Sequence, residues 1–421
     1  MKAGFYTIMA AQFFSSLADN ALLIAAIALL QQLHEPEWMT PALQQCFVVS
    51  YVVLAPLVGA FADSMAKGRV MLITNTIKVV GCLMMLAFVH PLIAYAVVGF
   101  GAAAYSPAKY GILTELLPPE QLVVANAWIE GLTVLSIILG NVVGGMLIGP
   151  KVSSVLLKFD FPFIDTSINT PPEAAIVVTA LIYVVAALFN LAIPDTGARY
   201  QHQERNPVRL LVDFSRCFLM LWRDKLGQIS LAVTTLFWGA GACLQFIVLK
   251  WAERSLRLPL EEGAMLSGVS AVGIALGAMI AAKIIPLKRA TAVLPVGIAM
   301  GIALITLVSV RWMPAVYVLL IVIGAIGGFF VVPMNALLQH RGHVLMSAGH
   351  SIAVQNFNEN VSILVMLALY ALMIRLDFRI QSVVLIFGLF ISGAMYFIMR
   401  WNAANHKADP HLDRLIGEAK H

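Results

Sequence analysis

Residues 5–33 read FYTIMAAQFFSSLADNALLIAAIALLQQL, an apolar run long enough to cross the hydrocarbon layer of a membrane as a helix. One carboxylate, Asp19, lies in the middle of this run, with Asn20 beside it. An ionised side chain near the bilayer centre costs about 2.5–3.5 kcal/mol on insertion scales, so Asp19 must line a polar cavity or pair with another group. Asp19 and Asn20 are therefore candidate functional residues.

The composition of the whole chain also indicates a membrane protein. Of its 421 residues, 60% are hydrophobic and only 12% are charged, and the mean hydropathy is +0.88. A soluble globular chain keeps about a quarter of its residues charged. We predict an all-α polytopic membrane protein with twelve transmembrane helices, near residues 5–33, 43–63, 70–90, 92–117, 122–149, 173–194, 226–251, 263–285, 291–310, 314–339, 347–374 and 380–401.

The distribution of Lys and Arg predicts the topology, because cytoplasmic loops carry an excess of these residues. With the amino terminus inside, seventeen of the 27 basic residues fall in cytoplasmic segments and eight in outer segments. The remaining two, Lys78 and Lys109, lie within spans. Both termini are thus expected in the cytoplasm, and the net charge of +5 indicates contact with anionic lipid headgroups, not with nucleic acid.

The longest charged connection, residues 195–225, divides the predicted spans into six and six. We predict a cytoplasmic linker there, with one amphipathic helix along the membrane surface. The flanking parts are an N-terminal six-helix bundle at 1–194, a C-terminal six-helix bundle at 226–401 and a cytoplasmic tail at 402–421.

The two halves of the sequence also share a pattern of glycine and proline. Gly101 is followed six residues later by Pro107, and Gly327 is followed six residues later by Pro333. A proline within a span bends the helix. Equivalent bends favour a duplicated six-helix unit, with the substrate site near the midplane between the units, as in a transporter.

The loop between the second and third spans, residues 59–69, reads GAFADSMAKGR. It resembles the signature loop of the major facilitator superfamily, in which an aspartate pairs at a cytoplasmic gate and basic residues follow. Asp63, Lys67 and Arg69 are the gating residues that this resemblance implies. Gly68 follows Asp63 by five residues and not by the usual three, and an ordinary short cytoplasmic turn is the alternative.

Further stretches narrow the resemblance: AQFFSSLADNALL at 11–23, GAAAYSPAKYGILTEL at 101–116, GGFFVVPMNALLQHRG at 327–342 and AVQNFNEN at 353–360. With the loop, they resemble the bacterial lysophospholipid transporter family of that superfamily over essentially the whole chain. The resemblance implies two pseudo-symmetric six-helix bundles in the bacterial inner membrane. It also implies a carrier that moves lysophosphatidylethanolamine and related lysophospholipids to the inner leaflet for reacylation, by alternating access with lateral substrate entry. The resemblance implies, in addition, a functional link to an acyl-ACP-dependent lysophospholipid acyltransferase.

The charged residues within the spans suit such a substrate. Its ethanolamine headgroup presents a phosphate and an ammonium. We assign Lys109 to the phosphate, because an ammonium binds phosphate without demanding fork geometry. Asp19, Glu130 or Glu359 would face the substrate ammonium. The alternative is that these charges pair with one another, Lys109 with Asp19 for example, and only hold helices in register.

Amide side chains near Glu359 extend the predicted site. Gln355 and Glu359 share one helix face at a spacing of four residues, whereas Asn356 and Asn360 share the adjacent face. Tyr110, beside Lys109, is a further candidate. Gln245 occupies in the second half the place that Asp19 holds in the first, where some relatives are expected to carry a basic residue. Glycines at Gly273, Gly277 and within 140–149 are expected to let helices pack closely.

Two other functions are alternatives to a lysophospholipid carrier. A proton-coupled exporter of amphipathic drugs would use Asp19 or Glu130 as its proton carrier. A lipid enzyme would need a histidine to deprotonate the attacking hydroxyl, but the chain has no His-x-x-x-x-Asp pair for an acyltransferase, no P-loop and no His-Glu-x-x-His zinc motif. We therefore expect a non-enzymatic carrier with no cofactor and no metal site.

Overall fold

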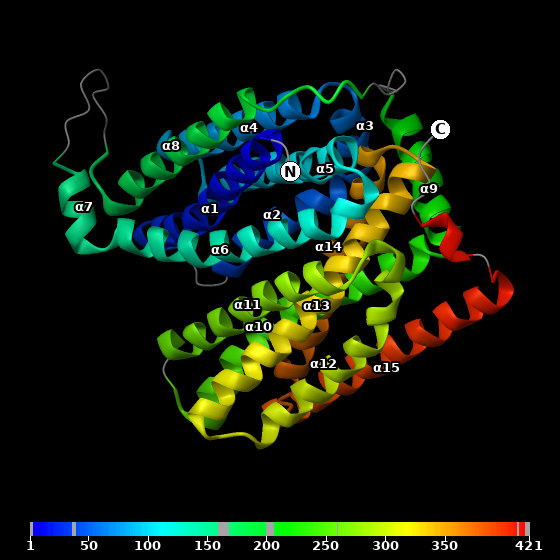
Figure 1. The fold of residues 1–421 in the computed structure, drawn as a ribbon. Helices are drawn as coiled ribbons and strands as arrows, with labels where there is room; N and C mark the ends of the chain where they lie inside the picture. The colour runs from blue at the N-terminus through cyan, green and yellow to red at the C-terminus, as the bar shows by residue number, and fades with distance from the viewer. Residues whose placement is uncertain are drawn as a thin grey trace. The chain divides into compact units, whose positions relative to one another are not determined.

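The computed structural model describes residues 3–35, 39–158, 168–198, 206–258, 260–410 and 412–416. Throughout these residues the chain is helical and forms no strand (Figure 1). Eleven helices match predicted spans, namely α1 (Ala3–Gln32), α4 (Lys67–Leu86), α5 (Pro91–Leu116), α6 (Leu122–Ile148), α8 (Pro171–Leu191), α10 (Gly227–Leu256), α11 (Leu260–Ile284), α12 (Leu294–Thr306), α13 (Met313–Leu345), α14 (Ala348–Arg375) and α15 (Ile380–Ala408).

The remaining elements connect these helices or follow the last of them. They are α2 (Met39–Val53), α3 (Ala55–Asp63), α7 (Pro150–Leu156), α9 (Pro207–Arg223) and the 3-10 turns η1 (Pro119–Gln121), η2 (Leu287–Val293), η3 (Leu307–Ser309) and η4 (Leu412–Leu415). A helix at α9 agrees with the amphipathic helix predicted for the linker. Residues 199–205 of that linker, and 411 and 417–421 of the predicted tail, lie outside the described residues.

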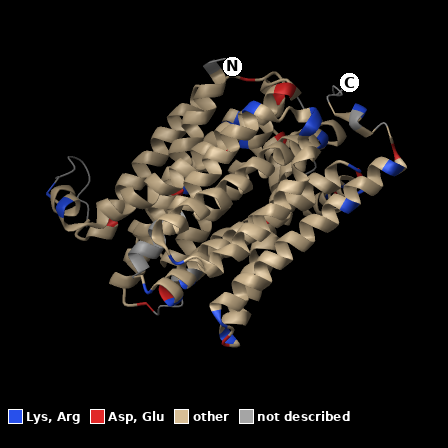
Figure 2. Cartoon of the chain, turned by 60° about the horizontal axis from the view of Figure 1, so that its bottom comes forward, with Lys and Arg blue, Asp and Glu red and all other residues tan. Residues whose placement is uncertain are grey.

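The lengths and compositions of the helices confirm a polytopic membrane protein. Ten of the described helices are long and apolar enough to cross a membrane, and the number rises to eleven if α2 and α3, which are bent by 65° relative to each other, are one span. Helix α11 is apolar over the shorter stretch Gly268–Ile284, so these helices are compatible with the twelve predicted spans. Figure 2 shows charged residues gathered near the helix ends, with few along the helices.

The second span differs from its prediction as one helix over 43–63. The chain breaks at Leu54, and Pro56 lies in the first turn of the new helix α3. A proline has no N–H for the preceding turn, and its ring crowds the residue before it, so the helix is interrupted there. By contrast, α5 and α13 remain continuous helices through Pro107 and Pro333.

The contacts of the chain divide it into two compact units. One comprises Met1–Ile112 with Leu135–Leu210, and the other comprises Leu113–Val134 with Leu211–His421. The end of α5 and the start of α6 therefore belong with the second half of the chain by their contacts. In the first unit, α8 packs on both α1 and α4. The core there includes small residues of α1, such as Ala18, Ala25 and Ala26, which let neighbouring helices approach closely.

In the second unit, α11 and α13 meet backbone to backbone. A Cβ atom added at Gly277 would lie 1.9 Å from the Ala325 carbonyl oxygen, and one at Gly273 would lie 2.3 Å from the Ile321 carbonyl oxygen. Gly324 and Gly328 of α13 meet carbonyl oxygens of α11 in the same way, at 2.0 and 2.1 Å. The prediction of close packing at Gly273 and Gly277 is confirmed, because only glycine fits at such distances.

We expect Gly277→Ala to destabilise the protein by about 1–3 kcal/mol or more, because α11 and α13 must separate to admit the methyl group. Thermal unfolding of the purified protein in detergent measures this loss. Gly268→Ala on the same helix is the matched control, since a Cβ there meets nothing within 4 Å. The control should unfold at or slightly above the wild-type temperature, because alanine favours a helix. Equal stability of both variants would contradict the packing argument.

Candidate functional site

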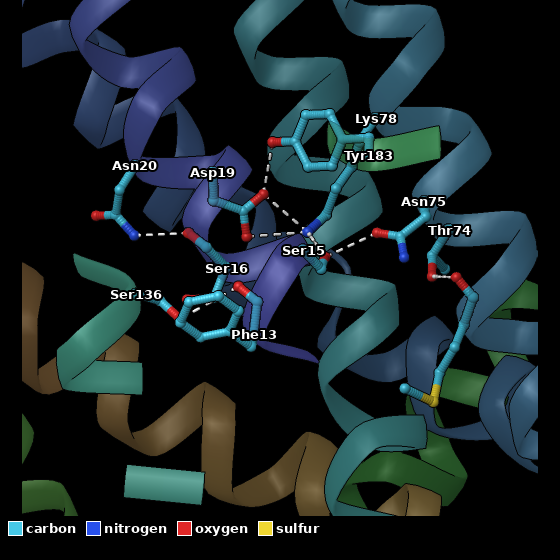
Figure 3. Close-up of polar contacts among 11 residues, drawn as sticks. Phe13, Ser15, Ser16, Asp19, Asn20, Thr74, Asn75, Lys78, Ser136 and Tyr183 are labelled. Atoms are coloured by element: carbon cyan, nitrogen blue, oxygen red, sulfur yellow. Dashed lines mark hydrogen bonds and ion pairs between the residues drawn. The ribbon is translucent and has the colours of Figure 1, made fainter. Parts of the chain in front are cut away.

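Asp19 lies in a cluster of polar side chains within the first unit (Figure 3). Its partner is Lys78 of α4, whose Nζ donates to both carboxylate oxygens, at 2.8 and 2.9 Å. The Tyr183 hydroxyl of α8 donates to Asp19 Oδ1 at 2.7 Å. Lys78 Nζ also donates to Ser15 Oγ at 3.0 Å, and Ser15 Oγ donates to Asn75 Oδ1 at 2.7 Å. The carboxylate in the first span is therefore paired, as its cost in hydrocarbon demands.

Helical spacing in the sequence creates this cluster. Ser15 and Asp19 are four residues apart on α1, and Asn75 and Lys78 are three apart on α4, so each pair shares one helix face. Gly101 of α5 makes room for the aliphatic part of Lys78, because a Cβ there would lie 2.8 Å from Lys78 Cγ.

The two charges of the pair differ in their exposure. The Lys78 side chain is 1% exposed, whereas the Asp19 side chain is 21% exposed. Lys78 has three N–H donors, and they meet three acceptors, the two Asp19 oxygens and Ser15 Oγ. Its Nζ also lies 5.1 and 5.4 Å from the ring centroids of Tyr105 and Tyr183. The ammonium is thus enclosed by its partners, and Asp19 is the member of the pair that a ligand can reach.

Lys109, which only the alternative of a structural pair placed beside Asp19, is not its partner. Lys109 is half-buried on α5, and its Nζ lies 4.2 Å from the centroid of the Tyr110 ring. The lysine that pairs with Asp19 is Lys78, whereas the alternative of a structural pair named Lys109. Asn20 points away from the cluster, and its Nδ2 donates to the Ser16 carbonyl oxygen at 2.8 Å (Figure 3).

A second polar cluster lies in the second unit and brings three predicted residues together. Asn335 Nδ2 of α13 donates to Glu130 Oε1 at 3.3 Å. Gln355 Nε2 of α14 donates to Asn335 Oδ1 at 3.0 Å and to Glu359 Oε1 at 2.8 Å. Glu130 and Glu359 are only 2% and 7% exposed. Two buried carboxylates are therefore connected through neutral amides.

Further amide groups surround this chain of contacts. The side chains of Asn126 and Gln339 exchange two hydrogen bonds, at 2.9 and 2.8 Å. Gln355 Oε1 is buried and has no hydrogen-bond partner among the described residues. Asn356 is buried on the adjacent face, where its carbonyl oxygen accepts from the Asn360 side chain at 2.8 Å. Gln245 is exposed on α10, and the role predicted for it stays a prediction.

The predicted gating loop contains a buried ion pair. Asp63 ends α3 and Lys67 begins α4, and their side chains form an ion pair while Lys67 Nζ also donates to the Ala62 carbonyl oxygen at 2.8 Å. Arg69 is exposed. In the part of the chain that the structure describes, no three His, Cys, Asp or Glu side chains gather as metal ligands.

Lys78, Tyr183 and Asn335 were not among the residues predicted for the site. Lys78 carried the same signal as Asp19, a charge within an apolar span, and could have been paired with it on that ground. Tyr183 and Asn335 carried no comparable signal, because one tyrosine or asparagine in a membrane helix is common. Only the packing of α8 and α13 brings them to the carboxylates.

Comparisons with known proteins agree with this architecture. The model of the Major Facilitator Superfamily matches residues 8–365. Proteins named lysophospholipid transporter LplT from Yersinia enterocolitica and Yersinia pestis are 42% identical to the chain over 379 and 380 residues, each covering 89% of this chain and 88% of the relative.

Solved structures show the same fold at low identity. The transporter FucP, described in an outward conformation, aligns with a TM-score of 0.71 and 14% identity over 95% of this chain and 98% of its own. A bacterial homologue of the iron transporter ferroportin aligns with a TM-score of 0.72 and 12% identity over 96% and 100% of the two chains. The resemblance of the sequence is thereby confirmed, and the chain belongs to the major facilitator superfamily.

Proposed function

We propose that this protein moves lysophospholipids, lysophosphatidylethanolamine among them, across the bacterial inner membrane to the inner leaflet. The name and the 42% identity of the Yersinia relatives support the substrate class. The structural observation that carries the proposal is Asp19, a carboxylate that is held by a buried lysine within an apolar helix bundle and is still partly exposed. Such a group suits the cationic end of an amphipathic substrate.

In this proposal, Asp19 receives the substrate ammonium. A carboxylate has about four acceptor positions. Three of those on Asp19 are occupied, two on Oδ1 by Lys78 and Tyr183 and one on Oδ2 by Lys78. The remaining position on Oδ2 can accept from an ammonium without displacing Lys78. Lys78 is then a positioning residue, and Lys109, with Tyr110 beside it, is the proposed partner of the phosphate.

The second cluster is proposed to act in alternating access. Glu130 and Glu359 are connected by the amides of Asn335 and Gln355, which can exchange hydrogen-bond partners. We assign Gln355 to the phosphate or glycerol hydroxyl of a passing headgroup. Its buried Oε1 has no partner among the described residues and can accept from a hydroxyl, whereas its Nε2 can donate to a phosphate only after it leaves Asn335 or Glu359. Asn356, on the adjacent face, is a second such candidate.

Entry from the side and a cytoplasmic gate complete the proposed cycle. The acyl chain stays in lipid while the headgroup passes through the protein, so that no long apolar tunnel is needed. The buried pair of Asp63 and Lys67, with Arg69 following, is proposed to open and close with the cytoplasmic gate.

The proposed cellular role is to return lysophospholipid for reacylation. Both termini lie in the cytoplasm in this proposal, and the chain performs no chemistry itself. An acyl-ACP-dependent lysophospholipid acyltransferase is its functional partner, because the lysophospholipid delivered to the inner leaflet lacks one acyl chain.

We expect Asp19→Asn to lower the initial rate of inward transfer of labelled lysophosphatidylethanolamine by about tenfold or more, since a charge-assisted hydrogen bond is worth about 1.5–3 kcal/mol. The rate is measured in spheroplasts that lack their own carrier, at matched expression. Thr76→Val is the control, because Thr76 is exposed on α4 and, among the described residues, its hydroxyl donates to the Leu72 carbonyl oxygen of its own helix. It should transfer lipid within about twofold of the wild type, as a lost surface hydrogen bond changes little.

The same assay separates this proposal from a proton-coupled exporter. Well-expressed wild-type protein that moves no lysophospholipid, but exports an amphipathic dye only while a pH gradient is maintained, would overturn the substrate assignment. Full lipid transfer by Asp19→Asn would leave the substrate in place and remove Asp19 from the site.

A stability cycle at Asp19 and Lys78 tests the positioning role. Lys78→Met should destabilise the protein by about 3–5 kcal/mol, because it leaves an uncompensated carboxylate within the bundle. The double variant Asp19→Asn with Lys78→Met should recover most of this loss in thermal unfolding, since no buried charge remains. Lipid transfer should stay low in both variants. Recovery of transfer together with stability would show that the pair only holds helices in register.

A further inference from the structure

Helix α9 (Pro207–Arg223), within the stretch that joins the two halves of the chain, presents three chemically distinct faces. The helix begins with Asn206, whose Oδ1 accepts from the Val208 N–H at 3.0 Å, and Pro207 follows as its first residue. Successive residues turn by about 100°. Its apolar, basic and packed side chains therefore fall on separate strips, and each strip can be compared with its surroundings.

One face is packed against α14 and α15, within the second unit. The Phe214 and Phe218 rings lie edge-on to Phe357 of α14, with centroids 5.4 and 6.2 Å apart. The Trp222 ring stacks on Trp401 of α15 at 6.5 Å, and Trp222 Nε1 donates to Asn358 Oδ1 at 3.3 Å. Aromatic contacts along two turns therefore hold this face of α9 against α14 and α15.

A buried ion pair beside the end of α9 fixes the rotation of the helix. Arg341 of α13 donates through Nη2 and Nε to the two carboxylate oxygens of Asp224, at 2.7 and 3.2 Å. Its Nη1 donates to the Leu415 carbonyl oxygen at 3.1 Å, and Asp224 Oδ1 accepts from the Gly227 N–H at 2.7 Å. A two-pronged pair of this kind sets an orientation as well as a distance. The other two faces of α9 are thus held outward.

The second face is an exposed aliphatic strip. It is formed by Val208, Leu211, Val212 and Leu219, all of which are exposed although they are large and apolar. Val208, Val212 and Leu219 follow the spacing of four and seven residues that places side chains on one side of a helix. Apolar side chains that point away from the packed core need an apolar surrounding.

The third face is a row of arginines beside that strip. Arg209, Arg216 and Arg223 follow one another at intervals of seven residues, which is about 20° short of two full turns. All three are exposed, and the Arg216 side chain is 74% exposed even with Asp213 3.3 Å away. Since Asp213 is the only acidic residue of α9, its three arginines leave a net charge of +2.

We propose that α9 lies in the surface of the adjacent leaflet and binds anionic glycerophospholipids there. The aliphatic strip enters the boundary of the acyl chains, as in interfacial amphipathic helices. The three arginines then reach the phosphates and negative headgroups, which a guanidinium binds with two parallel hydrogen bonds. The lipid is bound as a neighbour of the protein and not as its transported substrate, so the inference holds whichever lipid is carried.

Quenching of a fluorophore on α9 by labelled lipids tests the proposal. The full chain carries Ser215→Cys, labelled with bimane, in a background with serine at Cys46 and Cys217, and is placed in nanodiscs. Ser215 is exposed on the aliphatic side of the helix. Brominated phosphatidylglycerol or brominated phosphatidylcholine is added at the same fraction of a phosphatidylethanolamine bilayer.

We expect a given fraction of brominated phosphatidylglycerol to quench as much as an about fivefold higher fraction of brominated phosphatidylcholine. The reason is that each basic residue near the surface contributes about 1 kcal/mol to the binding of anionic lipid, which is a factor of about five in affinity. The preference should shrink in about 1 M salt, where the screening length falls to about 3 Å. R209Q/R216Q/R223Q should abolish the preference while phosphatidylcholine still quenches. K288Q/R289Q/R400Q removes three exposed basic residues elsewhere and should keep the preference.

The wild-type comparison decides the proposal even if a variant folds poorly. Equal quenching by the two lipids, or a preference that survives in R209Q/R216Q/R223Q, would overturn the arginine site. No quenching by either lipid would show that α9 lies away from the bilayer and would favour a soluble partner for its aliphatic strip.

Discussion

The cost of a charge in hydrocarbon organises the first unit of this protein. Lys78 is almost fully enclosed, and Asp19 and Ser15 together accept from all three of its N–H donors, which offsets the cost of burying an ammonium. Those contacts fix the rotation of α1 against α4, and Tyr183 adds α8. Even the glycine at position 101 follows from this pair, since it leaves space for the lysine stem.

The two polar clusters solve the same problem in different ways. At Asp19, opposite charges meet directly, and removing either one leaves the other unpaired within the helix bundle. Around Glu130 and Glu359, neutral amides of Asn335 and Gln355 connect two buried carboxyl groups. An amide offers a donor and an acceptor and can serve a carboxylate or a ligand in turn. The direct ion pair at Asp19 suits a rigid binding position for the headgroup. The amide contacts around Glu130 and Glu359 suit a part of the site that rearranges.

The sequence predicted the helices better than it predicted their partners. Apolar run lengths placed the spans, and the spacing of four residues correctly paired Gln355 with Glu359, because both signals are local. The pairing of Asp19 with Lys78 spans 59 residues and depends on which helices become neighbours. Lys78 and Lys109 both lie within spans, and no local signal shows which of the two meets Asp19. The bend before Pro56 was missed because hydropathy alone does not register a break between two apolar helices.

The glycine contact between α11 and α13 has a mechanical consequence. Side chains at an ordinary helix interface can change rotamer and so let two helices slide, but at Gly273, Gly277, Gly324 and Gly328 backbone rests on backbone. At these four positions no side chain lies between the two helices that could be rearranged. We therefore expect the pair to move as one rigid body, so that a change of shape in the second unit is absorbed by the helices around it.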